Sequence, residues 1–232
     1  MTDVPTQPDL FEQCCDMDGS LNERLAAFAE GLRKSYPLFA EAVDRVVARL
    51  QRSGAGQNAP RAGDTMPPFL FPDEAGHLVS LEDFLHTGPL ALTFHRGHWC
   101  PYCRISANAL SEAHREIVKE GAHIVAVIPD RQPIATEFKV RTKAGIPILI
   151  DMDNSYALSL GLAFWVGEEM KRLMLKESYD LAQFHGNDAW FLPIPATFVI
   201  GRDGIVKTRF IDPDYRKRMT IEDLLSALRD NL

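Results

Sequence analysis

The sequence predicts an α/β fold, with a central mixed sheet flanked by helices and a helical extension in front of it. Three observations support this prediction. Apolar residues recur at helical spacing before residue 52 and again from 105 to 117. Two short runs of consecutive apolar residues, Leu90–Phe94 and Ile124–Ile128, are typical of buried strands. Further apolar runs lie on both sides of Arg202-Asp203-Gly204, a sequence that favours a tight hairpin turn.

The composition is that of a globular protein with a core. The chain has 232 residues, of which 46% are hydrophobic and 25% charged, and its formal net charge is −7. This length fits one large domain or a domain with an extension. The acidic balance argues against binding of a nucleic-acid backbone. The densest basic run is Arg216-Lys217-Arg218, and we expect it to lie in a solvated loop.

The sequence also indicates a compartment. No apolar run approaches the roughly 20 residues that a membrane helix needs, so no membrane contact is expected. The stretch "MTDVPTQPDLFEQ" lacks the basic and apolar regions of a secretory signal. We therefore expect the cytoplasm, a reducing compartment where paired cysteines are more often catalytic or metal-binding than structural.

The N-terminal part is expected to be helical after an irregular start. Residues 1–19 are rich in Pro and Asp, and Ser20 with Glu23 makes a capping box. Helical spacing then continues past Pro37, which indicates one or two helices, up to the linker "RSGAGQNAPRAGD". We assign residues 1–62 to this extension and linker, and residues 63–232 to the second domain. The apolar stripe of the extension must be buried on its own domain or in a homodimer.

The second domain has a recognisable order of elements. Strand 90–94 is followed by a helix, by strand 124–128, by a helix over 133–143 and by a short strand over 146–151. Residues 155–190 are expected to be helix or loop. The hairpin around Asp203-Gly204 follows, and a helix opened by Thr220 and Asp223 closes the chain. This is the order of the thioredoxin-like fold.

The stretch "FHRGHWCPYCRIS" joins the first strand to the first helix of that domain. Pro101 suits the first helical position, which makes Cys100 the N-cap residue. Free backbone N–H groups and the helix dipole there favour a thiolate, and Arg96 adds positive charge nearby. Cys103 lies almost one turn further on the same face, at a spacing that a disulfide tolerates. The pattern predicts that Cys100 attacks a substrate disulfide and that Cys103 resolves the mixed disulfide.

Two other interpretations remain open. His95, His98, Cys100 and Cys103 are four metal-ligand types, so a Cys₂His₂ zinc site is conceivable. Zinc modules usually draw their ligands from two separated pairs, however, and this cluster is contiguous. Alternatively, both cysteines only pack in an inert interaction module. Our main prediction includes no metal and no cofactor.

Longer segments carry a resemblance. "GDTMPPFLFPDEAGHLVSLEDFLHTGPLALTFHRGHWCPYC" and "PATFVIGRDG" are similar to the AhpC/TSA (redoxin) family in the peroxiredoxin branch of the thioredoxin superfamily. The match covers about residues 63–230. "GNDAWFLPIPATFVI" and "DPDYRKR" resemble the peroxiredoxin-like proteins within that family. The resemblance implies an antioxidant enzyme that reduces disulfides or hydroperoxides, uses a thiol reductant and often dimerises.

The resemblance leaves the attacking sulfur open. Against the peroxiredoxin pattern P-x-x-x-T-x-x-C, Arg96 stands at the Pro, Cys100 at the Thr and Cys103 at the peroxidatic Cys. Pro195 replaces the family's arginine and stands where thioredoxins have a cis-proline. The alternative is an ordinary loop proline, because X-Pro bonds are mostly trans. By peroxiredoxin logic Cys103 reacts first, and by thioredoxin logic Cys100 does. We favour Cys100, because a peroxide site without Thr and Arg lacks donors for the leaving oxygen.

Further residues complete the predicted site. Trp99 and Tyr102 are expected to be rim aromatics that shield the sulfurs and contact a protein or small-molecule disulfide. The dipeptide Pro101-Tyr102 is common in glutaredoxins. With Pro195 and Arg96, these residues form the predicted substrate-binding set.

Five residues are given no part in the chemistry. Cys14 and Cys15 are adjacent, cannot easily bridge to each other and are interpreted as incidental. His185, Asn187 and Asp188 are interpreted as residues of a Gly-containing turn that lies near the "PATF" strand.

Overall fold

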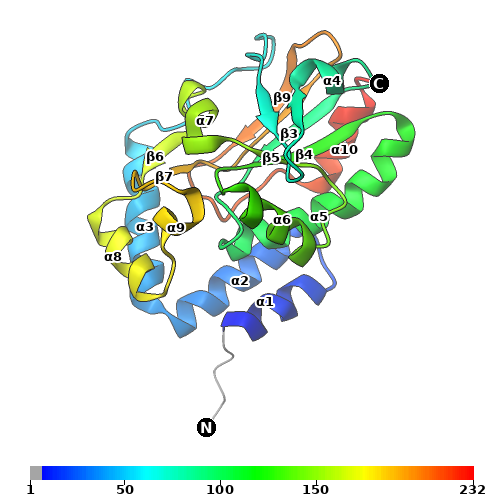
Figure 1. Ribbon diagram of the computed structural model, residues 1–232. Helices are drawn as coiled ribbons and strands as arrows, with labels where there is room; N and C mark the ends of the chain where they lie inside the picture. The colour runs from blue at the N-terminus through cyan, green and yellow to red at the C-terminus, as the bar shows by residue number, and fades with distance from the viewer. Residues whose placement is uncertain (1–6) are drawn as a thin grey trace.

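The computed structural model describes residues 7–232, and Figure 1 shows their arrangement. The described part of the extension contains helices α1 (Gln7–Asp16), α2 (Leu21–Ser35) and α3 (Pro37–Arg52). The predicted capping box opens α2, where Ser20 accepts the backbone N–H of Glu23 at 3.3 Å and the Glu23 carboxylate accepts that of Ser20 at 2.7 Å. Pro37 begins a new helix, so the extension past Ser20 forms two helices.

Helix α1 corrects the expectation of an irregular N-terminus. Leu10 and Cys14 on this helix are buried in the main hydrophobic core. Tertiary burial of these side chains therefore stabilises a helix that the local composition disfavours. Residues 1–6 of the predicted irregular stretch lie outside the described residues.

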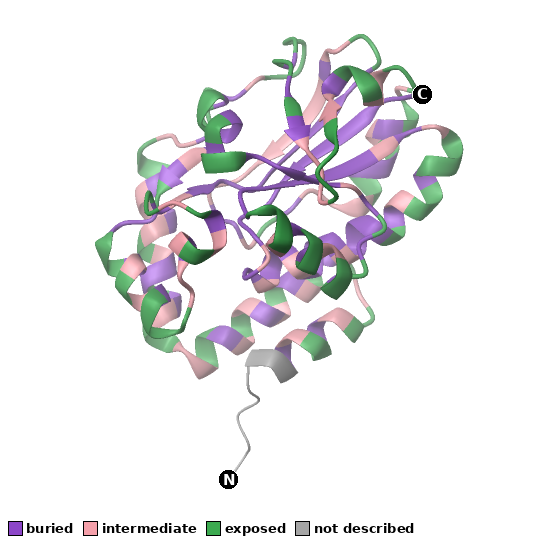
Figure 2. Cartoon of the chain, in the orientation of Figure 1, coloured by how far each residue is buried: buried purple, intermediate pink, exposed green. Residues whose placement is uncertain are grey.

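Within residues 7–232, five strands form the central sheet in the order β5-β4-β3-β8-β9. The strands are β3 (Leu90–Phe94), β4 (His123–Ile128), β5 (Ile148–Ile150), β8 (Ala196–Ile200) and β9 (Val206–Ile211). Strands β3, β4 and β5 run parallel, and β8 pairs antiparallel with both β3 and β9. The mixed sheet and its order confirm the predicted fold class. Its central strands are buried, as Figure 2 shows.

Side chains alternate between the two faces of the sheet. Leu92 and Phe94 of β3 point into one core cluster, whereas Ala91 points into a second. The second cluster is closed by α5 (Pro101–Ile117), α6 (Gln132–Arg141) and α10 (Ile221–Arg229). The remaining short elements are β1 (Leu70–Pro72), β2 (Leu78–Ser80), α4 (Leu81–Leu85), η1 (Val118–Glu120), η2 (Met152–Asn154), α7 (Ser155–Ser159), β6 (Ala163–Trp165), α8 (Glu168–Lys176), α9 (Leu181–His185) and β7 (Phe191–Pro193).

The two predicted C-terminal features are present. The β8–β9 hairpin turns at Gly204, whose φ of 75° suits glycine, and the Asp203 carboxylate accepts the Ile205 N–H at 3.1 Å. Thr220 caps α10 through the N–H of Asp223 at 3.0 Å. The pair of strands β6 and β7, however, was not predicted from the sequence. Strands of three residues are too short to show an alternating pattern.

The extension packs against α5 and shares the main core. Leu25 and Phe28 of α2 are fully buried in the same cluster as Phe94 of the sheet. Helices α1 and α2 both contact α5, the helix that begins at the cysteine motif, and Figure 1 shows them beside it. The extension therefore lies over the end of the sheet where the candidate site is.

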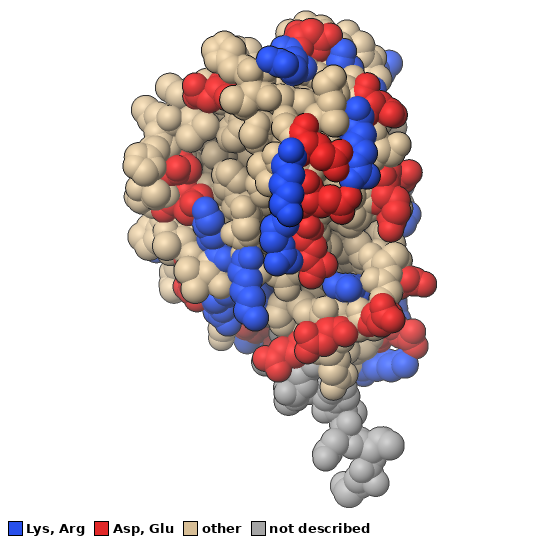
Figure 3. Space-filling view, turned by 90° about the vertical axis from the view of Figure 1, so that its right-hand side faces the viewer, with Lys and Arg blue, Asp and Glu red and all other residues tan. Residues whose placement is uncertain are grey.

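The charged side chains are mixed in sign. Figure 3 shows basic and acidic side chains next to one another over one face of the molecule. Ion pairs such as Arg229–Glu120 at 2.8 Å and Arg141–Glu137 at 2.9 Å join opposite charges. Separately, no helix within residues 7–232 has the length and apolarity needed to cross a membrane.

Candidate active site

The two cysteines lie where β3 is followed by α5, as predicted. β3 ends at Phe94 and α5 begins at Pro101, the first helical residue. Cys100 is the N-cap residue, with φ −84° and ψ 112°. Cys103 lies in the first turn, and its N–H donates to the carbonyl oxygen of Cys100 at 3.0 Å. Both side chains therefore share the helix end at which unpaired N–H groups favour negative charge.

Both sulfurs are reduced, buried and in contact. Neither cysteine forms a disulfide, and Cys100 and Cys103 are 1% and 0% exposed. The Cys103 thiol donates a hydrogen bond to the Cys100 sulfur. Arg96 contacts both, because its backbone N–H donates to Cys103 Sγ at 3.3 Å and its Nη1 lies 3.9 Å from Cys100 Sγ. The arrangement is that of a dithiol close to disulfide formation.

The same contacts shift the pKa values of the Cys100 and Cys103 thiols in opposite directions. Burial by itself raises the pKa of both thiols. At Cys100 this is outweighed by the hydrogen bond from the Cys103 thiol, the charge of Arg96, the Cys103 N–H and the charge of Arg218, which together lower the pKa to about 6. At Cys103, burial and the neighbouring Cys100 sulfur raise the pKa well above its usual value. At neutral pH, Cys100 is thus the thiolate and Cys103 the thiol.

Arg96 is held between two aromatic rings. Its guanidinium carbon lies 3.8 Å from the centre of the Tyr215 ring and 4.8 Å from that of Trp99. The residue is only 6% exposed. A charge fixed in such dry surroundings stabilises a nearby thiolate more than a solvated charge does.

A second arginine comes from the C-terminal region and was not predicted from the sequence. Nη2 of Arg218 lies 3.7 Å from Cys103 Sγ, and Arg218 is 6% exposed. Its Nη1 also donates to the carbonyl oxygens of Tyr215 and Lys217. The expectation that residues 216–218 lie in a solvated loop is therefore wrong for Arg218. The available signal was the segment "DPDYRKR", which combines one aromatic residue with three consecutive basic residues and two aspartates.

Arg216 links this loop to the extension through ion pairs. It pairs with Asp214 of the same loop at 2.7 Å and with Asp44 of α3 at 2.8 Å. The three side chains are only partly exposed, which makes such pairs more effective than fully solvated ones. The position of Arg218 thus depends on contacts between the two ends of the chain.

Aromatic side chains cover the sulfurs. Tyr102 is 3% exposed and packs between Phe28 of α2 and Tyr215, at ring-centre distances of 5.0 and 5.3 Å. It is therefore buried, and does not stand at the rim as expected. Trp99 is 9% exposed. A space of about 20 Å³ beside Cys100 is lined by Phe28, by Pro101 and by other apolar side chains.

The two histidines of the motif turn away from the sulfurs. Nε2 of His95 lies 3.1 Å from Thr93 Oγ1, and burial together with the charge of Arg218 lowers the pKa of His95 to about 3. The backbone N–H of His98 donates to the Asp130 carboxylate at 2.6 Å, and its Nδ1 lies 3.4 Å from the same oxygen. Among the side chains that the structure describes, those of residues 10–232, no three of His, Cys, Asp or Glu converge as metal ligands. The zinc alternative therefore lacks a site in this structure.

Asp130 organises the loop that precedes Cys100. Gly97, with φ 131°, approaches it so closely that a Cβ there would lie 2.9 Å from a carboxylate oxygen. His185, expected in a turn, is buried, and its Nε2 lies 3.7 Å from Asp130. Asn187 and Asp188 do form the expected local contacts, with the Ala189 N–H and the Trp190 indole.

The fold and the cysteine pair can be compared with known proteins. The profile of the AhpC/TSA family matches residues 62–209. The chain belongs to the AhpC/TSA family. This confirms the resemblance identified in the sequence. The protein is accordingly a thiol-dependent oxidoreductase of the peroxiredoxin-like group.

Individual relatives are distant. Peroxiredoxin Bcp of Escherichia coli K12 is 27% identical over 105 residues, which are 45% of this chain and 67% of the relative. The structure of peroxidoxin BcpB from Mycobacterium tuberculosis matches with a TM-score of 0.57 and 22% identity, over 74% of this chain and 97% of that one. A mutant of peroxiredoxin 6 from Arenicola marina matches with a TM-score of 0.58 and 18% identity, over 72% and 71%. These structures show the fold.

Pro195 departs from the expectation taken from thioredoxins. Every peptide bond within the described residues is trans, so the cis form expected at Pro195 is wrong. The residue is buried and immediately precedes β8, whose Ala196 pairs with Phe94 at the end of β3. Pro195 therefore leads the backbone into the sheet beside the site.

The positive charge predicted from Arg96 is present at the site, and Arg218, which was not predicted, adds a second. Pro195 does occupy the family's arginine position, but Arg96 and Arg218 place two guanidinium groups next to the sulfurs. The positive charge therefore comes from other parts of the chain.

Cys14 and Cys15 of α1 have different surroundings. Cys14 is 4% exposed in the core, and Cys15 Sγ accepts the side-chain amide of Asn108 at 3.7 Å. Burial raises the pKa of both thiols. Both are free thiols, and their interpretation as incidental stays a prediction.

Proposed function

We propose that this AhpC/TSA protein is a thiol–disulfide oxidoreductase in which Cys100 is the nucleophile and Cys103 the resolving cysteine. The observation that supports this best is the asymmetry of the pair. The Cys100 sulfur accepts a hydrogen bond from Cys103 and has a pKa of about 6, while the pKa of Cys103 is raised. A thiolate and a thiol in contact are the two partners that disulfide exchange requires.

The steps follow from these protonation states. The Cys100 thiolate attacks one sulfur of a substrate disulfide, forms a mixed disulfide and releases the other sulfur as a thiolate. That leaving group can accept the proton of Cys103. The resulting Cys103 thiolate attacks the Cys100 sulfur, closes the Cys100–Cys103 disulfide and expels the second substrate thiolate. The substrate gains two electrons, and a thiol reductant later restores the dithiol.

Burial restricts the substrate. Cys100 is 1% exposed and Phe28 of the extension is 0% exposed beside the site. A folded protein disulfide cannot reach the sulfur unless α2 moves, whereas a small disulfide needs only local movement of side chains. We therefore favour a low-molecular-weight disulfide over a protein disulfide.

Two single-cysteine variants test the assignment. Cys100→Ser should abolish reduction of both insulin and a small disulfide, while Cys103→Ser should accumulate a mixed disulfide that mass spectrometry detects. If Cys100→Ser keeps full activity and Cys103→Ser loses the first step, the nucleophile is Cys103 and the proposal is wrong.

Hydroperoxide reduction by the same cysteines is the second candidate. The guanidinium groups of Arg96 and Arg218 supply the donors that a leaving oxygen needs, and a relative is named peroxiredoxin Bcp. Here Cys100 would take one oxygen to form a sulfenic acid and release an alcohol, and Cys103 would then close the disulfide and release water. With cumene hydroperoxide, Cys103→Ser should retain a sulfenic acid on Cys100 that dimedone traps. A label found on Cys103 in Cys100→Ser alone would favour the peroxiredoxin assignment.

Location and assembly belong to the same proposal. We expect a cytoplasmic protein, which cell fractionation checks. The apolar stripe of the extension is buried on its own domain, and light scattering after size exclusion tests the other predicted burial, in a homodimer.

A further inference from the structure

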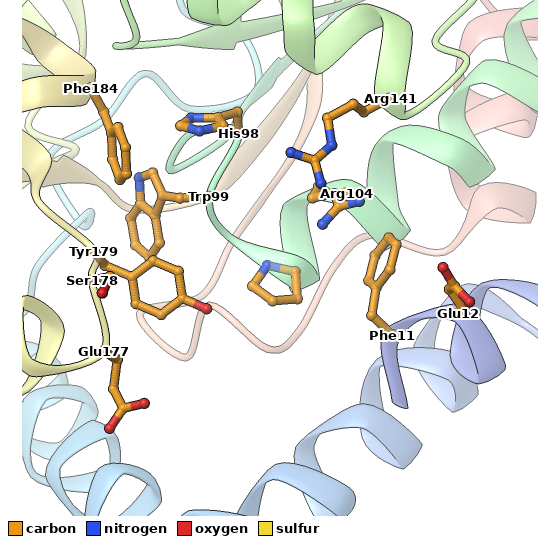
Figure 4. A pocket seen from close by; sticks show the side chains of 11 residues that line it. Phe11, Glu12, His98, Trp99, Arg104, Arg141, Glu177, Ser178, Tyr179 and Phe184 are labelled. Carbon is orange, nitrogen blue, oxygen red and sulfur yellow. The ribbon is translucent and has the colours of Figure 1, made fainter. Parts of the chain in front are cut away.

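A second, larger cavity lies beside the amino-terminal end of α5. It has a volume of about 370 Å³, within the range of small-molecule sites. Figure 4 shows that its walls come from several elements: Phe11 of α1, Arg104 of α5, Arg141 at the end of α6, and Trp99, Tyr179 and Phe184. It is distinct from the small space that touches Cys100.

Two guanidinium groups lie together on one wall. Arg104 and Arg141 interact as like charges, and burial together with the charge of Arg141 lowers the pKa of Arg104. The Arg104 guanidinium stacks on the Phe11 ring at 3.9 Å. Its Nε is buried without a hydrogen-bond partner, and among residues 10–232, whose side chains the structure describes, no carboxylate lies within 4.0 Å of the Arg104 guanidinium. Two close positive charges are unfavourable unless an anion joins them.

The acidic side chains at the cavity do not supply that anion. Glu177 lies on the far side of the cavity from the two arginines in Figure 4, and Glu12 lies on α1 beyond Phe11. Arg141 does pair with Glu137 at 2.9 Å, but this pair is exposed and thus weak. The arginine wall is therefore free to take a carboxylate from a ligand.

The cavity and the dithiol share a wall. Trp99, Pro101 and Tyr179 line both this cavity and the small space beside Cys100. The rings of Trp99 and Tyr179 are 5.7 Å apart between their centres. A ligand held by its carboxylate at the arginine wall thus has its other end directed at the aromatic pair that screens the nucleophile.

We propose that this cavity binds a small acidic disulfide, the oxidised form of a low-molecular-weight thiol that carries a carboxylate, with Arg104 and Arg141 as its anion-binding residues. The inference rests on the proposed function and names the substrate class for it. The chemistry is the exchange given above: the bound disulfide receives two electrons from the dithiol, leaves as one thiol and one thiolate, and the Cys100–Cys103 bond forms.

The test compares an acidic with a neutral disulfide on the reduced full-length protein. Oxidation by oxidised glutathione and by bis(2-hydroxyethyl) disulfide is followed in a single turnover, by loss of the thiolate absorbance. Arg104→Gln should lower the ratio of the two rate constants by about tenfold, since a charge-assisted contact is lost. Arg141→Gln, at an exposed position, should lower it less. Arg115→Gln removes an exposed charge from the same helix as a matched control and should leave the ratio unchanged.

The outcomes separate the two proposals. If both disulfides oxidise the dithiol but the ratio is unchanged in Arg104→Gln and Arg141→Gln, the acidic substrate class is wrong while the proposed function stands. If neither disulfide oxidises the wild-type dithiol, the proposed function fails and this inference fails with it. If circular dichroism shows that the Arg104→Gln variant does not fold, the ratio of rate constants in the Arg141→Gln variant, at an exposed position, still tests the acidic substrate class.

Discussion

The guanidinium of Arg218 lies 3.7 Å from the sulfur of Cys103, although 115 residues separate the two in the chain. The Arg96 guanidinium lies 3.9 Å from the Cys100 sulfur. The site is therefore assembled from the β3–α5 junction and from the loop before α10, and α2 covers it. The nucleophile, its charge partners and its cover come from three separate parts of the sequence.

The Cys100 thiol should titrate near pH 6. The thiolate absorbance in the ultraviolet should rise with a midpoint close to that value in wild type and should be absent from Cys100→Ser. In Cys103→Ser the midpoint should also change, because the thiol that donates to the Cys100 sulfur is replaced. A wild-type midpoint near 9, the ordinary value, would contradict this account.

Removal of the Arg218 charge should slow the resolving step. Arg218 lowers the pKa of the otherwise strongly perturbed Cys103, so Arg218→Met leaves less Cys103 thiolate to close the disulfide. We expect the mixed disulfide to decay about tenfold more slowly, as the loss of a charge-assisted contact implies. Lys217→Met, which alters a more exposed neighbour, is the control. If the mixed disulfide decays at the same rate in both variants, the charge of Arg218 does not assist the resolving step.

The cover formed by α2 should be stabilising and should limit access. Phe28 is fully buried against Tyr102, so Phe28→Ala should lower the free energy of unfolding by about 3–5 kcal/mol. It should also speed alkylation of Cys100 by iodoacetamide under native conditions. Leu38→Ala, at a residue of α3 that is 71% exposed, should change neither quantity. Unchanged alkylation in a folded Phe28→Ala protein would show that another element controls access.

His95 should make the protein sensitive to acid. Its folded-state pKa is about 3, against 6.5 for the ordinary group. The unfolded chain therefore binds this proton between those values and the folded protein does not, so stability falls as the pH drops below 6.5. The slope from His95 is about 1.4 kcal/mol per pH unit.

Urea unfolding at a series of pH values measures this effect. The His95→Gln variant keeps a polar partner for Thr93. Between pH 6 and 4, its free energy of unfolding should fall less steeply with decreasing pH than that of the wild type, by the slope assigned to His95. Identical slopes in the two proteins would mean that His95 does not resist protonation in the fold.

The sequence by itself determined the order of the central strands and of the helices that connect them, the Ser20 and Thr220 caps, the family, and a dithiol at a helix N-terminus. These features depend on contacts between residues a few positions apart, or on a motif read directly from the chain. Only the tertiary structure decided that Arg218 reaches Cys103, that α2 buries the site, that the bond before Pro195 is trans and that Arg104 meets Arg141. Each of these depends on packing between segments that are distant in the chain. The spacing of residues along one segment carries no record of such contacts, because the free energy that fixes them arises when separate elements bury their surfaces against each other.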